Sequence, residues 1–252
     1  MPRNPIIAFL GAPGPGAPRL QALLLGAGLL LGTDLPACAQ SSFSSSARPY
    51  RSASGLGGGL HFSSPAAAYM NTMFMRGSDK AQVEAVKRES AARRARQAST
   101  GAAPASTGFA LVPGEQAAVL ESLVAGAPAG PPREQLRRRL QAVSRQVEGT
   151  PGWQRGNLAA ATYALAGLSF TKATGRALDP GVAAELVHGI DDAYAHDPAF
   201  QVLEGRERSR IYYLYTATLG LTLQLSLSKD PAEVAQARAM ALNTLKELGI
   251  RH

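Results

Sequence analysis

The densest group of chemically capable side chains is HGIDDAYAHD, residues 188–197. Imidazole and carboxylate groups serve as metal ligands and as general acids or bases. At about 100° per residue of helix, the candidate metal ligands His188, Asp192 and His196 share one side, together with Glu185. The two histidines would lie about 12 Å apart along the axis, so one ion with bonds near 2 Å cannot bridge both. The pattern therefore predicts a solvent-facing polar side with, at most, an i,i+4 pair of metal ligands.

The rest of the chain offers fewer candidates for catalysis. It contains neither a G-x-S-x-G elbow nor a Walker loop for phosphate binding. Four aromatic residues could line a ligand cleft, although aromatic side chains at helical spacing usually indicate a core: Trp153, Tyr212, Tyr213 and Tyr215. We therefore expect no cofactor and favour a non-enzymatic protein. The alternative is a periplasmic hydrolase or metal-dependent enzyme that uses the helix of residues 185–197.

The only cysteine, Cys38, ends an N-terminal segment typical of an export signal. A basic residue, a leucine-rich stretch (residues 20–33) too short to span a bilayer and an Ala-Cys-Ala sequence follow in the expected order. This order predicts a signal peptide of residues 1–39, cleaved between Ala39 and Gln40, and a periplasmic or secreted protein without a transmembrane span. The alternative is a Leu-Pro-Ala-Cys lipobox, in which Cys38 is lipidated and anchors the protein to the envelope.

Positive charge is concentrated in the middle of the chain. The sequence carries 26 Lys and Arg against 18 Asp and Glu. Residues 40–112 contain nine basic and three acidic residues, whereas residues 113–252 contain fifteen and fourteen. A nearly neutral C-terminal part argues against specific nucleic-acid binding. The basic segment predicts weak contact with anionic envelope surfaces, in addition to an unidentified protein partner.

Two segments have the composition of linkers. Residues 40–78 are rich in Ser and Gly and predict a flexible linker. It includes a short helix at 67–75, whose Met and Phe side chains could dock on the main domain. Residues 99–108 predict a second linker, because Gly, Pro and Ser interrupt any helical pattern there.

Between the linkers, residues 79–98 predict a solvated basic helix. Its main apolar residues larger than alanine are Val83 and Val86, so we expect it to bury little. Four of its arginines are expected to drive weak binding to anionic surfaces: Arg88, Arg93, Arg94 and Arg96.

Residues 109–252 predict one domain of about five amphipathic helices, separated by Pro and Gly signals and without a strand pattern. The stretch 211–228 has no charge, but its Thr, Ser and Gln reduce its apolar content. We therefore expect the central helix of a bundle there and no membrane span. The predicted fold class is all-α: a single helical bundle behind a signal peptide and a flexible basic N-terminal arm.

Four short motifs between residues 109 and 249 accompany the expected helices: NLAAA at 157–161, DPAF at 197–200, RIYY at 210–213 and LKELG at 245–249. Together they resemble a bacterial family of exported all-helical domains that carries only an unknown-function label. The resemblance implies export and a helical fold. It implies no activity and no catalytic residues.

Overall fold

The computed structural model describes residues 65–99 and 107–251. Every secondary-structure element that spans several of these residues is a helix. The predicted all-α class is therefore confirmed for these residues. The predicted signal peptide, with Cys38, Ala39 and Gln40, lies outside them. The helices are α5 (Pro65–Gly77), α6 (Lys80–Ser99), α7 (Glu115–Val124), α8 (Pro131–Glu148), α9 (Leu158–Thr174), the short 3-10 helix η1 (Pro180–Val182), α10 (Ala183–Ala195), α11 (Pro198–Gln201), α12 (Gly205–Ser226) and α13 (Pro231–Glu247).

Three helices begin at an Asp-Pro pair, in which the aspartate side chain caps the helix. Asp179, Asp197 and Asp230 each accept a hydrogen bond from the backbone N–H two residues later, at 2.7–2.9 Å. The following proline occupies the first helical position, where a backbone N–H has no intrahelical partner. Local sequence is therefore enough to set the start of each of these three helices.

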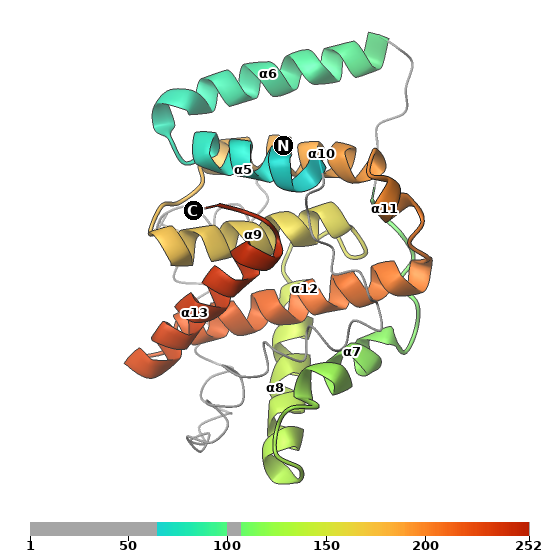
Figure 1. Ribbon diagram of the computed structural model, residues 1–252, viewed down its shortest axis with the longest axis vertical. Helices are drawn as coiled ribbons and strands as arrows, with labels where there is room; N and C mark the ends of the chain where they lie inside the picture. The colour runs from blue at the N-terminus through green and yellow to red at the C-terminus, as the bar shows by residue number, and fades with distance from the viewer. Residues whose placement is uncertain (1–64, 100–106, 252) are drawn as a thin grey trace.

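The helices form successive layers (Figure 1). Helix α6 is outermost, α5 and α10 form the next layer, and α9 lies between them and the pair α12 and α13. Every residue from Ala161 to Phe170 of α9 is buried. The uncharged stretch that begins at residue 211 belongs to α12, which packs against α7, α8, α9 and α13. Its expected central position is confirmed, and none of the described helices is both long and apolar enough to cross a membrane.

Helix α5 contributes to the main core. Met70, Met73 and Phe74 are buried, and the Phe74 ring lies 5.9 Å from that of Phe170 in α9, between centroids. The Asn71 side chain also donates to the Gly249 carbonyl at 2.7 Å, so α5 contacts the C-terminal segment as well. The short helix expected within the linker therefore exists and docks on the rest of the protein. The packed core includes residues of this helix, whereas the sequence suggested that the packed domain begins at residue 109.

Helix α6 is as hydrophilic as its sequence suggests, but it is not free of the fold. Val83 and Val86 are both buried in the main core cluster. Contacts with η1 and α10 hold the helix against the second layer. Its other described side chains are exposed or partly exposed, so the expectation of a helix with little to bury is confirmed, and these two valines are what it buries.

Candidate interaction site between α6 and α10

Helix α10 has an apolar side and a polar side, as its sequence pattern predicts. Leu186, Ile190 and Tyr194 are buried. Glu185 and Asp192 lie on the opposite side, which was expected to face solvent. In the structure α6 covers most of these two carboxylates, whereas His188 and His196 on the same side are exposed as expected.

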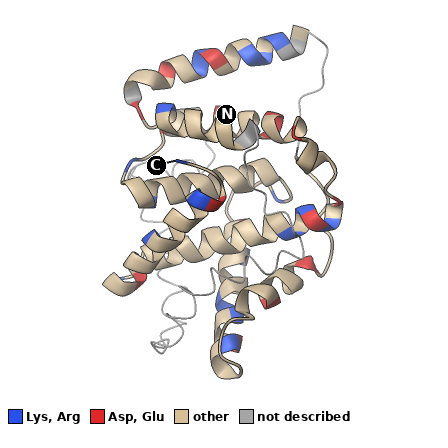
Figure 2. Ribbon diagram, viewed as in Figure 1, with Lys and Arg blue, Asp and Glu red and all other residues tan. Residues whose placement is uncertain are grey.

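Two arginines of α6 form ion pairs with these carboxylates. Arg93 Nη1 lies 3.8 Å from Asp192 Oδ2, and Arg94 Nη2 lies 3.6 Å from Glu185 Oε1. Figure 2 shows the basic residues along α6. Two of the four arginines expected to bind anionic surfaces therefore already have carboxylate partners within the protein.

Tyr69 of α5 completes the contact. Its hydroxyl donates to the Glu185 carbonyl at 3.2 Å, and the Arg93 guanidinium lies 5.5 Å from its ring centroid. Burial raises the pKa of Tyr69 to about 12, although Arg93 acts in the opposite direction. A Cβ atom on Gly189 would lie only 1.9 Å from the tyrosine ring, so α10 needs glycine at this position.

Sequence reasoning missed both Tyr69 and Gly189. The available signal was a glycine inside an otherwise amphipathic helical pattern, which often indicates close packing. The identity of the group that packs there could not be inferred, because Tyr69 precedes the glycine by 120 positions.

The three candidate metal ligands are not gathered into one site. His196 Nδ1 lies 2.7 Å from the Asp192 carbonyl and 3.6 Å from Asp192 Oδ1, so these two residues do meet as an i,i+4 pair. His188 is exposed on the same helix. Within residues 65–99 and 107–251, no group of three or more His, Cys, Asp or Glu side chains could hold a metal ion.

The neighbouring Asp191 points inward and has a structural partner. Its Oδ1 accepts from the Thr107 backbone N–H at 2.8 Å and from the Thr107 hydroxyl at 2.5 Å. The same hydroxyl also accepts from the Ala159 N–H at the start of α9, at 3.0 Å. Asp191 therefore ties the segment before α7 to α9 and α10.

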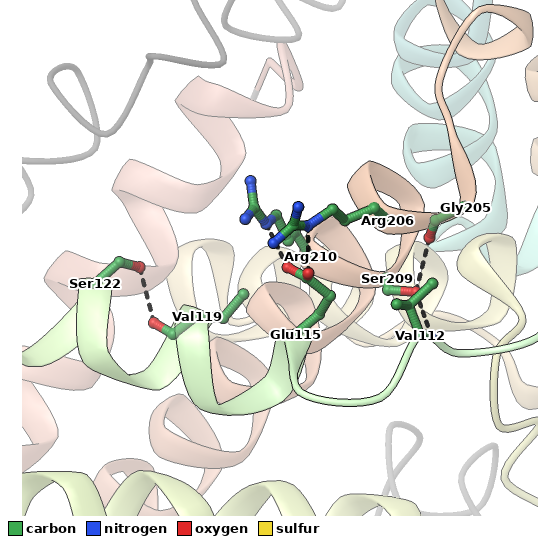
Figure 3. A network of polar contacts seen from close by, with 8 residues as sticks. All are labelled: Val112, Glu115, Val119, Ser122, Gly205, Arg206, Ser209 and Arg210. Atoms are coloured by element: carbon green, nitrogen blue, oxygen red, sulfur yellow. Dashed lines mark hydrogen bonds and ion pairs between the residues drawn. The ribbon is translucent and has the colours of Figure 1, made fainter.

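A second buried carboxylate joins α7 to α12 (Figure 3). Glu115 accepts hydrogen bonds from Arg206 Nε and from Arg210 Nε. The hydrogen bond from Arg210 holds the pKa of Glu115 below its ordinary value, with Arg206 acting in the same direction against the effect of burial. Beside this pair, the Val112 N–H donates to the Ser209 hydroxyl at 2.9 Å. The cluster fixes the start of α7 on the first turns of α12.

Glu115→Gln is expected to lower stability at neutral pH, and the effect should shrink in acid. A carboxylate with a depressed folded-state pKa stabilises the fold above its unfolded pKa near 4.5, and this contribution is lost as the pH falls through the lower folded value. Urea denaturation between pH 7 and pH 3 should show the variant and the wild type converging below about pH 4.5. Glu121→Gln, an exposed change on the same helix, is the control. A stability difference between Glu115→Gln and the wild type that stays constant over this pH range would contradict a stabilising role for the ionised Glu115 carboxylate.

The aromatic residues considered for a ligand cleft belong to the core. Tyr212, Tyr213 and Tyr215 are buried, and Trp153 Nε1 donates to the Tyr212 hydroxyl at 2.7 Å. Burial raises the pKa of Tyr212 well above its ordinary value. The favoured interpretation, core packing, is thus confirmed for the three tyrosines.

Comparison with protein-family models, with curated proteins and with solved structures found no match to this chain. The resemblance to a family of exported helical domains therefore rests on the four sequence motifs alone.

Proposed function

We propose that this chain is an exported, non-enzymatic helical protein that associates with the envelope and binds anionic surfaces through α6. The observation that carries the proposal is the composition of α6 together with its position. This 20-residue helix contains six basic and two acidic residues and forms the outermost layer. Packing in the core explains the two buried valines of this helix but not its many basic residues.

Electrostatics favours α6 over the rest of the protein as the contact. Residues 113–252 are almost neutral, and each Lys or Arg held near an anionic membrane contributes about 1 kcal/mol of attraction. A second run of basic residues, Arg137–Arg139, lies in α8. Arg137 and Arg138 each lie 2.8 Å from the Glu134 carboxylate, which reduces the positive electrostatic potential of this run.

The test is retention on anionic phospholipid vesicles at low salt. Replacing four arginines of α6 by glutamine should abolish retention, while wild-type retention should fall steeply with salt because exposed charges are screened beyond about 10 Å at 0.1 M. The substituted residues are Arg88, Arg93, Arg94 and Arg96. The matched control replaces four exposed arginines elsewhere and should retain binding: Arg145, Arg176, Arg238 and Arg251.

Thermal melting of both variants checks that the fold persists. Retention that survives the four α6 changes would contradict the proposal, and the run Arg137–Arg139 would be the next region to test. The alternatives from the sequence, a hydrolase using residues 185–197 and a lipoprotein anchored through Cys38, are not favoured by any particular contact among the described residues.

A further inference from the structure

The C-terminal half of α6 is held by charge, whereas its N-terminal half is held by apolar burial. The two buried side chains, Val83 and Val86, lie in the first two turns. Beyond them, the contacts with α10 include the ion pairs of Arg93 and Arg94, whose side chains remain nearly half exposed. Ion pairs of this kind are weak in water and are screened by salt. The C-terminal half of the helix can therefore separate from α10 while the valines stay docked, at the cost of these ion pairs and of the contact between Arg93 and the Tyr69 ring.

The surface beneath this half of α6 is acidic. Glu185 and Asp192 are covered by the arginines, and Glu185 Oε2 is buried without a hydrogen-bond partner among the described residues. A carboxylate oxygen covered in this way loses hydration without full compensation. Separation of the helix would return both carboxylates to water, which offsets part of the lost attraction.

The arginines of α6 cannot all reach one surface while the helix is docked. At about 100° per residue, Arg93 and Arg94 project to the side of Val83 and Val86, toward α10, whereas Arg88 projects to the opposite side. Arg96 lies between these two directions, about 60° from Arg93 around the helix. Because the four side chains diverge over about 12 Å of helix, they cannot converge on a single small anion. An extended anionic surface can contact several of them, and more of them once the helix leaves α10.

We propose that an anionic membrane surface displaces the C-terminal half of α6 from α10, with Arg93 and Arg94 exchanging the carboxylates of Asp192 and Glu185 for lipid phosphate groups. Membrane contact thereby uncovers the polar side of α10. This inference rests on the proposed function, since it concerns the same basic helix. It adds that the carboxylates of α10 compete with the membrane.

Competition predicts that removing the carboxylates strengthens membrane binding. The double variant Glu185→Gln/Asp192→Asn should bind anionic vesicles about two- to thirtyfold more tightly, the range expected when two weak ion pairs no longer hold the helix. The control Glu121→Gln/Glu247→Gln changes the net charge equally at exposed positions away from α6. Equal affinities of the two variants would overturn the inference.

Hydrogen exchange on the wild-type protein tests the uncovering directly. Vesicles should accelerate exchange in α10 and leave exchange in the central helix α9 unchanged. Inorganic phosphate at the same ionic strength should leave α10 unchanged, and an equal response to it would assign the displacement to free phosphate instead. Bound protein with unchanged exchange in α10 would overturn the inference and leave the proposed function intact. A wild-type protein that does not bind vesicles would overturn both.

Discussion

Phe74→Ala should lower the free energy of unfolding by about 3–5 kcal/mol, the usual cost of truncating a buried phenylalanine. Phe74 is 0% exposed and packs against Phe170 and Tyr163 of α9, with ring centroids 5.9 and 6.3 Å away. Chemical denaturation of the variant measures the loss. Met75→Ala is the matched control, since its side chain is 44% exposed and its removal should change stability by no more than about 0.5 kcal/mol.

Removal of the chain before residue 109 tests the contribution of α5 to the core more severely, because it deletes the whole helix together with α6. The shortened protein should lose cooperative melting, because it lacks the side chains of α5 and α6 that fill the main core cluster. If residues 109–252 melt cooperatively at the wild-type temperature, α5 is not part of the core, and the domain boundary expected from the sequence is correct.

Leu221→Ala is expected to destabilise the protein by about 2–5 kcal/mol. Leu221 is 3% exposed in the second core cluster, where α12 packs against α7 and α8. Leu227→Ala, six residues later and 45% exposed at the end of α12, should have a small effect. A loss below about 1 kcal/mol for Leu221→Ala would place this side of α12 on a surface.

The amino-acid sequence by itself determined the helical class and carries local start signals for some of the helices. Asp-Pro pairs at Asp179 and Asp230 act within two residues, so no distant contact is needed to recognise them. The division of α10 into an apolar and a polar side follows from the 3.6-residue period alone. Burial of the uncharged stretch in α12 likewise follows from composition. Its apolar residues are unfavourable in water, and its Thr, Ser and Gln residues are unfavourable in a membrane.

Only the tertiary structure decided what each side of a helix faces. The polar side of α10 contacts the arginines of α6 across about a hundred positions of sequence, and charge complementarity does not reveal which of many carboxylates an arginine will meet. The docking of α5 depends on Tyr69 fitting against Gly189, a steric match between distant segments. Local propensity and periodicity act over a few residues, whereas shape and charge complementarity act between surfaces that exist only after the helices have formed. That difference explains why the helices were predictable and the α6–α10 contact was not.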